Sequence, residues 1–209
     1  MDILSNKELV ELFNNRVLDI APNYFLEIGA YTGEQSIYIS EQLPDTKVFA
    51  YEANPYNYAK YAVSKNNLQY IHQAVSNYTG NTTFYLQTKR DPKKTKYVRG
   101  NNSLLKRNDE KTIYEEVTVK CDTLDNMFHD SKGSFALWID AEGHGFEILE
   151  KSANVLTNTK IIFIEVESKE FWKDQQLDTI VIDFLQNKGF TLLARDQEYP
   201  EQYNIIFIK

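Results

Sequence analysis

The segment EIGAYTGEQS, residues 27–36, joins the end of an apolar strand to the start of a helix through a short glycine turn. Glycine at positions 29 and 33 permits backbone dihedral angles that other residues rarely adopt, and it lets another group approach the main chain closely. The helix that follows would direct unpaired backbone N–H groups into the space above the strand. This pattern predicts a strand–turn–helix unit of the kind from which α/β folds are built.

A second apolar strand, in VFAYEANP at 48–55, ends on the acidic residue Glu52. In doubly wound sheets, an acid about twenty residues after the first turn accepts hydrogen bonds from ribose hydroxyls. The first turn reads G-x-x-x-G, with Tyr31 where the middle glycine of a dinucleotide site would admit a pyrophosphate. The spacing therefore favours S-adenosylmethionine, which has no phosphate, over NAD. A turn that merely links strand to helix is the alternative, and the position of Glu52 argues against it.

The chain of 209 residues has the length of one α/β domain with additions, so we expect a single domain over 1–209. A capping-box pattern at Ser5 and Glu8 predicts an N-terminal helix within 1–20. Strands and helices then alternate, which indicates a mostly parallel sheet with helices on both faces. The expected strands are 24–29, 47–52 and 70–75, and the expected helices are 34–43 and 55–66.

Residues 80–122 interrupt this alternation with two strand-like pieces, TTFYLQ and EEVTVKC, and predict an added β excursion. The regular pattern then resumes with a short helix near 123–128, helices at 145–156 and 171–187, and strands in SFALWIDA, KIIFIEVE, 190–195 and YNIIFIK. The last connection, about seven residues long, is too short for a parallel crossover. We therefore expect an antiparallel final strand.

The net charge of −7 argues against a general nucleic-acid binder, but the charge is unevenly distributed. Residues 89–107 contain eight Lys or Arg and one Asp. Long polar loops in compact domains are often either functional or disordered. Two interpretations of this basic loop stay open: a solvated excursion, or a lid or wall that attracts an anionic acceptor.

The remaining composition excludes several classes of protein. No apolar run is long enough to span a membrane, and the N-terminus does not have the pattern of a signal peptide, so we expect a cytoplasmic protein. Cys121 is the single cysteine and the three histidines are scattered, which excludes an internal disulfide and a zinc-ligand pattern.

Acidic residues follow the ends of four expected strands, where ligands bind in open α/β sheets. They are Glu27, Glu52, the segment 140–145 with Asp140 and Glu142, and the pair Glu165 and Glu167. Asp140 could orient a ligand ammonium group, hold a divalent cation, or take a proton from a hydroxyl. His144 could act as a base at neutral pH, or be a loop residue with only structural hydrogen bonds.

Several of these segments, in order, resemble the FkbM-type methyltransferases, a branch of the S-adenosylmethionine-dependent class I fold. They are EIGAYTGEQS, VFAYEANP, IHQAVSNYTGNTTFY, NNSLL, TLD at 123–125, ALWIDAEGHGFEIL, IIFIEVE and NIIFIK. The resemblance covers residues 24–209. It implies a Rossmann-like, doubly wound, seven-stranded sheet and an O-methyltransferase that acts on a hydroxyl of a sugar, glycan or related small molecule.

The resemblance also implies roles for individual residues. Those implied to bind S-adenosylmethionine are Glu27, Gly29, Ala30, Tyr31, Gly33, Ser36, Glu52, Ala53, Asn54, Gln73, Ala74 and Asp140. Those implied on the reaction side are Asp140, Glu142 and Glu165. Our own hypothesis makes Asp140 a base or metal ligand, with His144 and Glu165 in support and a metal possible at Asp140 and Glu165. The chain departs from the family pattern at Glu27, where Asp is usual, at Ala53, where Pro often follows the acid, and at Gly145, where many members have Glu. The last departure leaves the number of substrate-facing carboxylates open.

Two alternative functions remain. An RNA cap ribose methyltransferase would use the basic loop on phosphates, but it needs a lysine just before the first strand, and residues 17–25 contain none. A non-catalytic module that binds S-adenosylmethionine would bind the cofactor without turning over any acceptor.

Overall fold

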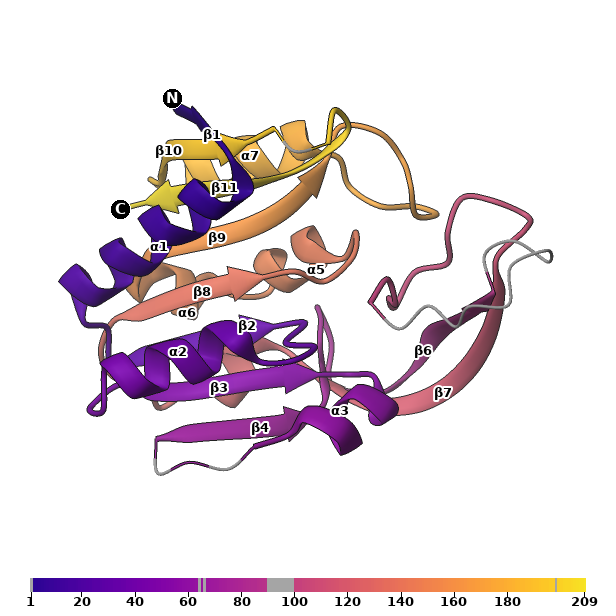
Figure 1. The fold of residues 1–209 in the computed structure, drawn as a ribbon, viewed down its shortest axis with the longest axis horizontal. Helices are drawn as coiled ribbons and strands as arrows, with labels where there is room; N and C mark the ends of the chain where they lie inside the picture. Colours follow the sequence, from indigo (N-terminus) through magenta and orange to yellow (C-terminus); the bar gives the residue numbers. More distant parts are fainter. Residues whose placement is uncertain (1, 64, 66, 90–99, 198) are drawn as a thin grey trace.

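The computed structural model describes residues 2–63, 65, 67–89, 100–197 and 199–209. Within these residues, a central eight-stranded sheet has the order β1-β10-β11-β9-β8-β2-β3-β4 and carries helices on both faces (Figure 1). Its strands are β1 (Asp2–Leu4), β2 (Tyr24–Ile28), β3 (Lys47–Glu52), β4 (Leu68–His72), β8 (Phe135–Ile139), β9 (Thr159–Glu167), β10 (Thr191–Asp196) and β11 (Gln202–Ile208). The helices are α1 (Asn6–Ile20), α2 (Glu34–Gln42), α3 (Pro55–Tyr61), α4 (Leu124–Met127), α5 (Gly145–Glu150), α6 (Ala153–Asn158) and α7 (Asp178–Asn187).

Strands β4, β3, β2, β8 and β9 are parallel, so their carboxyl ends meet at one edge of the sheet. Strand β11 is antiparallel to both β9 and β10, which confirms the orientation expected for the final strand. Glu27 of β2 is paired with Ala50 of β3 on one side and with Trp138 of β8 on the other. The glycine turn therefore leaves the sheet from an inner strand, between the strands that end at Glu52 and Ile139.

Two apolar layers hold the helices against the sheet. On one face, Leu9, Phe13 and Val17 of α1 and Ile39 of α2 are buried against the sheet. On the other face, α5, α6 and α7 contribute buried Ile148, Leu149, Val155, Leu156, Val181 and Leu185. The N-terminal helix begins with the expected capping box: Ser5 and Glu8 exchange hydrogen bonds at its first turn.

Several boundaries differ from those expected. The sheet contains the seven expected strands and also β1, in which Asp2 and Leu4 pair with β10. The expected strand 70–75 is two strands, β4 and β5 (Ala74–Val75), and the expected helix 55–66 ends at Tyr61. The expected helix 145–156 is interrupted at Ser152, whose amide bonds to Leu149, and so forms α5 and α6.

The expected helix 171–187 begins only at Asp178. Its first part is instead a loop, because the side-chain oxygen of Gln175 accepts hydrogen bonds from the amides of Phe171 and Trp172, at 2.6 and 2.7 Å. These bonds satisfy the amides outside a helix and hold the loop beside the carboxyl edge of the sheet.

The β excursion expected over 80–122 is present. Strands β6 (Gly80–Lys89) and β7 (Ile113–Asp122) form an antiparallel hairpin, and β5 adds to it in the order β5-β7-β6. In Figure 1 this second sheet extends away from the carboxyl edge of the main sheet. Of the basic loop 89–107, residues 90–99 lie outside the described residues, so its proposed role as a lid stays a prediction. Among the described residues, every helix is too short or too polar to span a bilayer.

Candidate active site

The glycine turn packs directly on the segment that follows β8. Gly29 has φ +83°, and a Cβ at this position would lie 1.8 Å from the backbone oxygen of Asp140. Gly33, with φ +72°, would place a Cβ 2.7 Å from the ring of Tyr70. Both positions therefore require glycine for conformation and for space. The turn is anchored because the amides of Gly29 and Ala30 donate to the carbonyl of Tyr51.

Glu52 lies at the carboxyl end of β3 with both oxygens oriented by backbone amides. Its Oε2 accepts a hydrogen bond from Tyr31 at 2.7 Å, and its Oε1 accepts one from Asn54 at 2.6 Å. Burial raises the pKa of this carboxyl to about 7, and the two amide bonds oppose that rise. Each carboxylate oxygen has a second lone pair. Glu52 can therefore accept further hydrogen bonds from a pair of ligand hydroxyls.

Glu27 has a different role from Glu52. Its Oε2 accepts a hydrogen bond of 2.8 Å from the amide of Ser36, in the first turn of α2. Burial raises the pKa of Glu27 to about 7. A helix N-terminus of this kind often binds a ligand phosphate. Here the Glu27 carboxylate already accepts a hydrogen bond from an amide of the helix N-terminus. This agrees with a ligand that has no phosphate above the turn.

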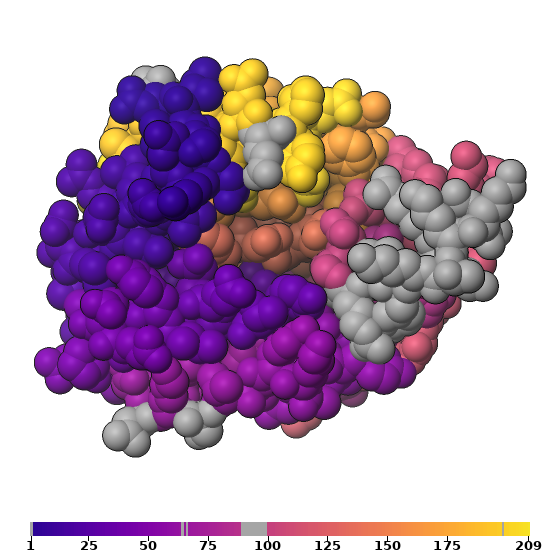
Figure 2. All heavy atoms as spheres, viewed as in Figure 1, coloured from indigo at the N-terminus to yellow at the C-terminus, as the bar shows by residue number. Residues whose placement is uncertain are grey.

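A cavity of about 200 Å³ opens over the carboxyl ends of β2 and β3. Figure 2 shows the surface hollowed between the purple N-terminal half and the orange and pink segments. The predicted residues that line the cavity are Gly29, Tyr31, Glu52, Ala53, Gln73, Ala74, Asp140, Glu142 and His144. The predicted residues outside its lining are Glu27, Ala30, Gly33, Ser36, Asn54 and Glu165. The first five of these shape the turn and the helix starts around it.

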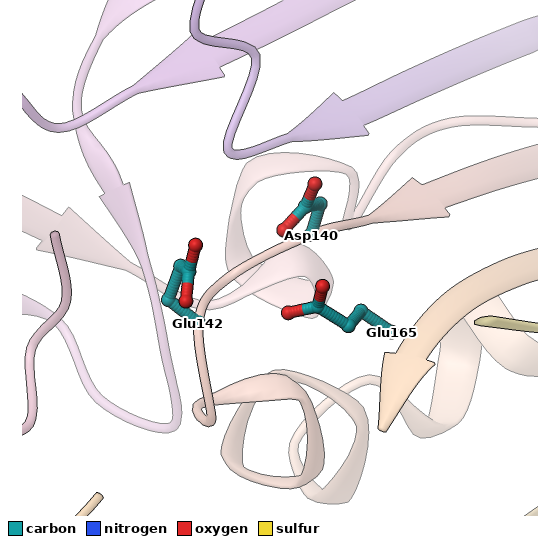
Figure 3. Close-up of side chains that lie close together, drawn as sticks. All are labelled: Asp140, Glu142 and Glu165. Atoms are coloured by element: carbon teal, nitrogen blue, oxygen red, sulfur yellow. The ribbon is translucent and has the colours of Figure 1, made fainter. Parts of the chain in front are cut away.

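Three carboxylates converge beside this cavity. Asp140, Glu142 and Glu165 each place an oxygen within 4.8 Å of the others, and Figure 3 shows the three side chains pointing toward one another. Burial raises the pKa of all three groups, and the charge of Asp140 raises the pKa values of Glu142 and Glu165 further. Such a cluster favours protons, a metal ion or a ligand cation, since each reduces the mutual repulsion.

The expected strand in SFALWIDA runs through Asp140 to Ala141. Strand β8 instead ends at Ile139, and Glu142 has a left-handed backbone with φ 50°. The turn rather than strand alternation therefore brings Glu142 to Asp140. Glu167, two residues after Glu165 in β9, accepts a hydrogen bond from Gln175 at 3.1 Å.

His144 lines the cavity, but its Nε2 lies 2.7 Å from the hydroxyl oxygen of Ser76. Its Nδ1 is 3.7 Å from Oε2 of Glu147. Burial lowers the pKa of His144 to about 4, so the imidazole is neutral at physiological pH. The hydrogen bond to Ser76 ties the second sheet to the start of α5.

The sequence interpretation missed the segment that returns from the basic loop, residues 100–107. Asn101 donates to Glu142 Oε1 at 3.1 Å, and the Ser103 hydroxyl donates to the Glu142 carbonyl at 2.7 Å. Arg107 lies 4.0 Å from the centre of the Trp172 ring, with Nη2 3.8 Å from Glu142 Oε2. The motif NNSLL was the available signal, but nothing in the sequence indicated which strand end this segment reaches.

A second cavity, of about 310 Å³, lies on the other side of Asp140. It is bounded by α1, the start of α2, the ends of β8 and β9, and the β10–β11 connection. Its lining residues are Asn6, Val10, Gln35, Trp138, Asp140, Phe163, Glu165, Asp196, Tyr199, Gln202 and Asn204. Asp140 is common to the two linings, so it stands between the two cavities.

The fold and this edge of the sheet define a class I methyltransferase-type α/β protein: a glycine turn, an acidic residue ending the second parallel strand, and a cavity between them. The family model described as "Methyltransferase FkbM domain" matches residues 27–192. The chain belongs to this family of S-adenosylmethionine-dependent methyltransferases, which confirms the resemblance noted in the sequence.

Solved structures with similar folds include methyltransferases of low sequence identity. Precorrin-6y C5,15-methyltransferase from Geobacter metallireducens is 15% identical with a TM-score of 0.46, over 99% of this chain and 93% of that one. The S-adenosylhomocysteine-bound methyltransferase PaMTH1 from Podospora anserina is 13% identical with a TM-score of 0.43, over 99% and 80%. No curated protein sequence matches the chain.

Proposed function

We propose that this protein is an O-methyltransferase that transfers the methyl group of S-adenosylmethionine to a hydroxyl of a sugar, glycan or related small molecule. The observation that carries the proposal is the position of Asp140, whose side chain belongs to the linings of both cavities. Transfer between a donor and an acceptor requires their reacting atoms to meet where the two sites adjoin, and a general base must reach the acceptor's proton at that point. Asp140 is the carboxylate at that boundary.

In this proposal the first cavity holds the cofactor. Glu52 accepts hydrogen bonds from the ribose hydroxyls, Gly29 allows close approach of the main chain, and Gln73 with Ala74 borders the adenine. These roles fit the amide-oriented oxygens of Glu52 and the use of the α2 N-terminus by Glu27. When bound, S-adenosylmethionine supplies a methyl group on a positively charged sulfur.

The oxygen of the acceptor hydroxyl would bond to the methyl carbon as the carbon–sulfur bond breaks. Asp140 takes the proton that this hydroxyl loses. General base catalysis of this kind contributes about 10²- to 10⁴-fold to a rate. The raised pKa of Asp140 suits this role, because a carboxyl whose pKa lies nearer to neutrality is a stronger base. In the proposal, Glu142 and Glu165 support Asp140, and His144 positions the wall of the cavity through Ser76.

The decisive experiment incubates the protein with isotope-labelled S-adenosylmethionine and a panel of glycans, lipid-linked sugars and capped RNA. Label in a sugar supports the proposal, and label in capped RNA alone supports the RNA cap alternative. Cofactor binding with no labelled acceptor favours the non-catalytic module. Asp140→Asn should lower turnover by about 100-fold or more while the affinity for S-adenosylhomocysteine changes little. Asp45→Asn, at an exposed position, is the matched control.

A divalent cation held by Asp140 and Glu165 is a second role for the same carboxylates. The three clustered oxygens of Asp140, Glu142 and Glu165 favour it, since hard cations bind carboxylates. Turnover that is lost in EDTA and restored by Mg²⁺ would support this role. Turnover that is unchanged in EDTA would leave Asp140 as the base alone.

A further inference from the structure

The second cavity has its own polar chemistry, which bears on what the acceptor is. Two buried side-chain oxygens in its lining, Gln35 Oε1 and Glu165 Oε1, have no hydrogen-bond partner among the described residues. Both atoms are acceptors. A buried acceptor without a partner costs free energy until a donor reaches it. The ligand of this cavity is therefore expected to present hydrogen-bond donors.

Asp196 shows the contrast within the same lining. Its oxygens accept hydrogen bonds from Asn6 at 2.9 Å and from the amide and side chain of Asn204 at 2.9 and 2.8 Å. This carboxylate is already satisfied by the chain. In this lining, the buried oxygens that still lack a hydrogen-bond donor among the described residues are therefore those of Gln35 and Glu165, next to Asp140.

The charge of the lining also favours a ligand that presents hydrogen-bond donors. Its ionisable side chains of Asp and Glu type are Asp140, Glu165 and Asp196, and the described lining contains no Lys, Arg or His. A phosphate or carboxylate in this cavity would offer acceptors only, and the described lining has no basic side chain to pair with it. A neutral hydroxyl or an ammonium group would donate to them.

Aromatic rings form the apolar part of the wall. Trp138 and Phe163 are stacked with ring centres 3.7 Å apart, and Tyr199 is 61% exposed in the β10–β11 connection. Binding sites combine such apolar surfaces with a few placed polar groups. The C–H face of a ring-shaped polyol can pack on an aromatic ring while its hydroxyls reach the polar groups.

We propose that this cavity binds the acceptor, and that the acceptor is a polyol such as a neutral or amino sugar that has no anionic group near the reacting hydroxyl. Its hydroxyl or amino groups donate to Gln35 and Glu165 beside Asp140. The identity of the cavity as the acceptor site rests on the proposed function. This acceptor differs from the anionic one expected from the basic loop, because the described lining of the cavity has acidic side chains and no basic ones.

The test compares four sugars by calorimetry: methyl glucoside, glucosamine, glucuronate and glucose 6-phosphate, each up to about 100 mM because weak sites bind in the millimolar range. Each is titrated into the protein at low salt, with and without S-adenosylhomocysteine. We expect the first two to bind at least about tenfold more tightly than the two anions, and high salt to reduce the difference.

Gln35→Met removes the acceptor oxygen at similar length and should weaken the two tighter sugars about tenfold, the value of one or two hydrogen bonds. Gln42→Met, at an exposed position of the same helix, is the matched control and should leave their affinity unchanged. The affinity for S-adenosylhomocysteine should be the same in both variants. Glu165→Gln should reduce the discrimination against the anions.

Anionic sugars that bind as tightly as neutral ones would overturn the inference. So would the failure of all four sugars to bind, or an unchanged affinity in Gln35→Met. Failure of S-adenosylhomocysteine to bind would overturn the proposed function instead, and it is read from a separate titration. The two outcomes are therefore distinguishable.

Discussion

Gly29 and Asp140 are in such close contact that a single methyl group on Gly29 would lie 1.8 Å from the Asp140 carbonyl oxygen. The Asp140 amide also donates to Ile28, the residue before the glycine, at 2.9 Å. The turn after β2 and the turn after β8 are thus one packed unit. Gly29, which is proposed to let the cofactor approach, therefore also positions Asp140, which is proposed to contact the acceptor.

Gly29→Ala is expected to destabilise the protein and to displace Asp140. The substituted residue would be strained at φ +83° and would collide with backbone, so we expect a loss of about 2 to 4 kcal/mol in the free energy of unfolding. Urea denaturation measures this loss. Gly100→Ala is the control, since a Cβ there meets nothing within 4 Å, and its effect should be below about 1 kcal/mol. Equal stability of both variants would contradict the close packing.

Glu52→Gln should weaken the binding of S-adenosylhomocysteine by about tenfold, because hydrogen bonds to a charged acceptor are stronger than those to a neutral amide. The side chain would keep one oxygen for the Tyr31 or Asn54 amide, so the fold should persist. Calorimetry measures the affinity, and circular dichroism checks the fold. Glu115→Gln, in β7 outside the cavity lining, should bind as the wild type does.

Glu27→Gln should stabilise the cofactor-free protein at pH 8. Burial raises the pKa of Glu27 to about 7 in the folded state, above its ordinary value of 4.5. The folded state therefore binds the proton more tightly, and the associated stability is complete below pH 4.5 and is lost as the pH rises through 7. The ionised group costs up to about 3 kcal/mol at pH 8, which the amide would avoid.

Urea denaturation at pH 5 and pH 8 measures this effect as the difference between variant and wild type. Glu34→Gln, exposed in the same helix turn, is the control and should retain the pH dependence of the wild type. An identical pH dependence in Glu27→Gln would show that Glu27 is not the group responsible.

His144→Gln should make the protein less sensitive to acid. The pKa of His144 is lowered to about 4 in the folded state, from an ordinary value of 6.5. The unfolded state then takes up the proton first as the pH falls below 6.5, and stability decreases until the pH reaches about 4. The loss is up to about 3 kcal/mol in the wild type. Thermal unfolding at pH 7 and pH 4.5 tests this, with His129→Gln at an exposed site as control.

The local elements of the fold could be predicted from the sequence because their signals are local. The capping box at Ser5, the glycine turn after Ile28 and the acidic end of β3 at Glu52 depend on neighbours within a few residues. The antiparallel direction of β11 followed from the length of one connection. The family could also be recognised, since its motifs occur in order along the chain.

The composition of the site was decided by the tertiary structure. The segment 100–107 is held beside Glu142 by backbone hydrogen bonds of Ser103 with Tyr85 in β6, and of Lys106 and Asn108 with the loop at 171–173. Glu142 reaches Asp140 through a left-handed turn, and Gln35 and Glu165 meet in one cavity from different elements. These contacts join residues far apart in the chain, and their energies depend on burial and on the surrounding charges. Local backbone preferences can be read from the sequence directly. Burial, and the interactions between charged side chains, arise only once the strands have assembled.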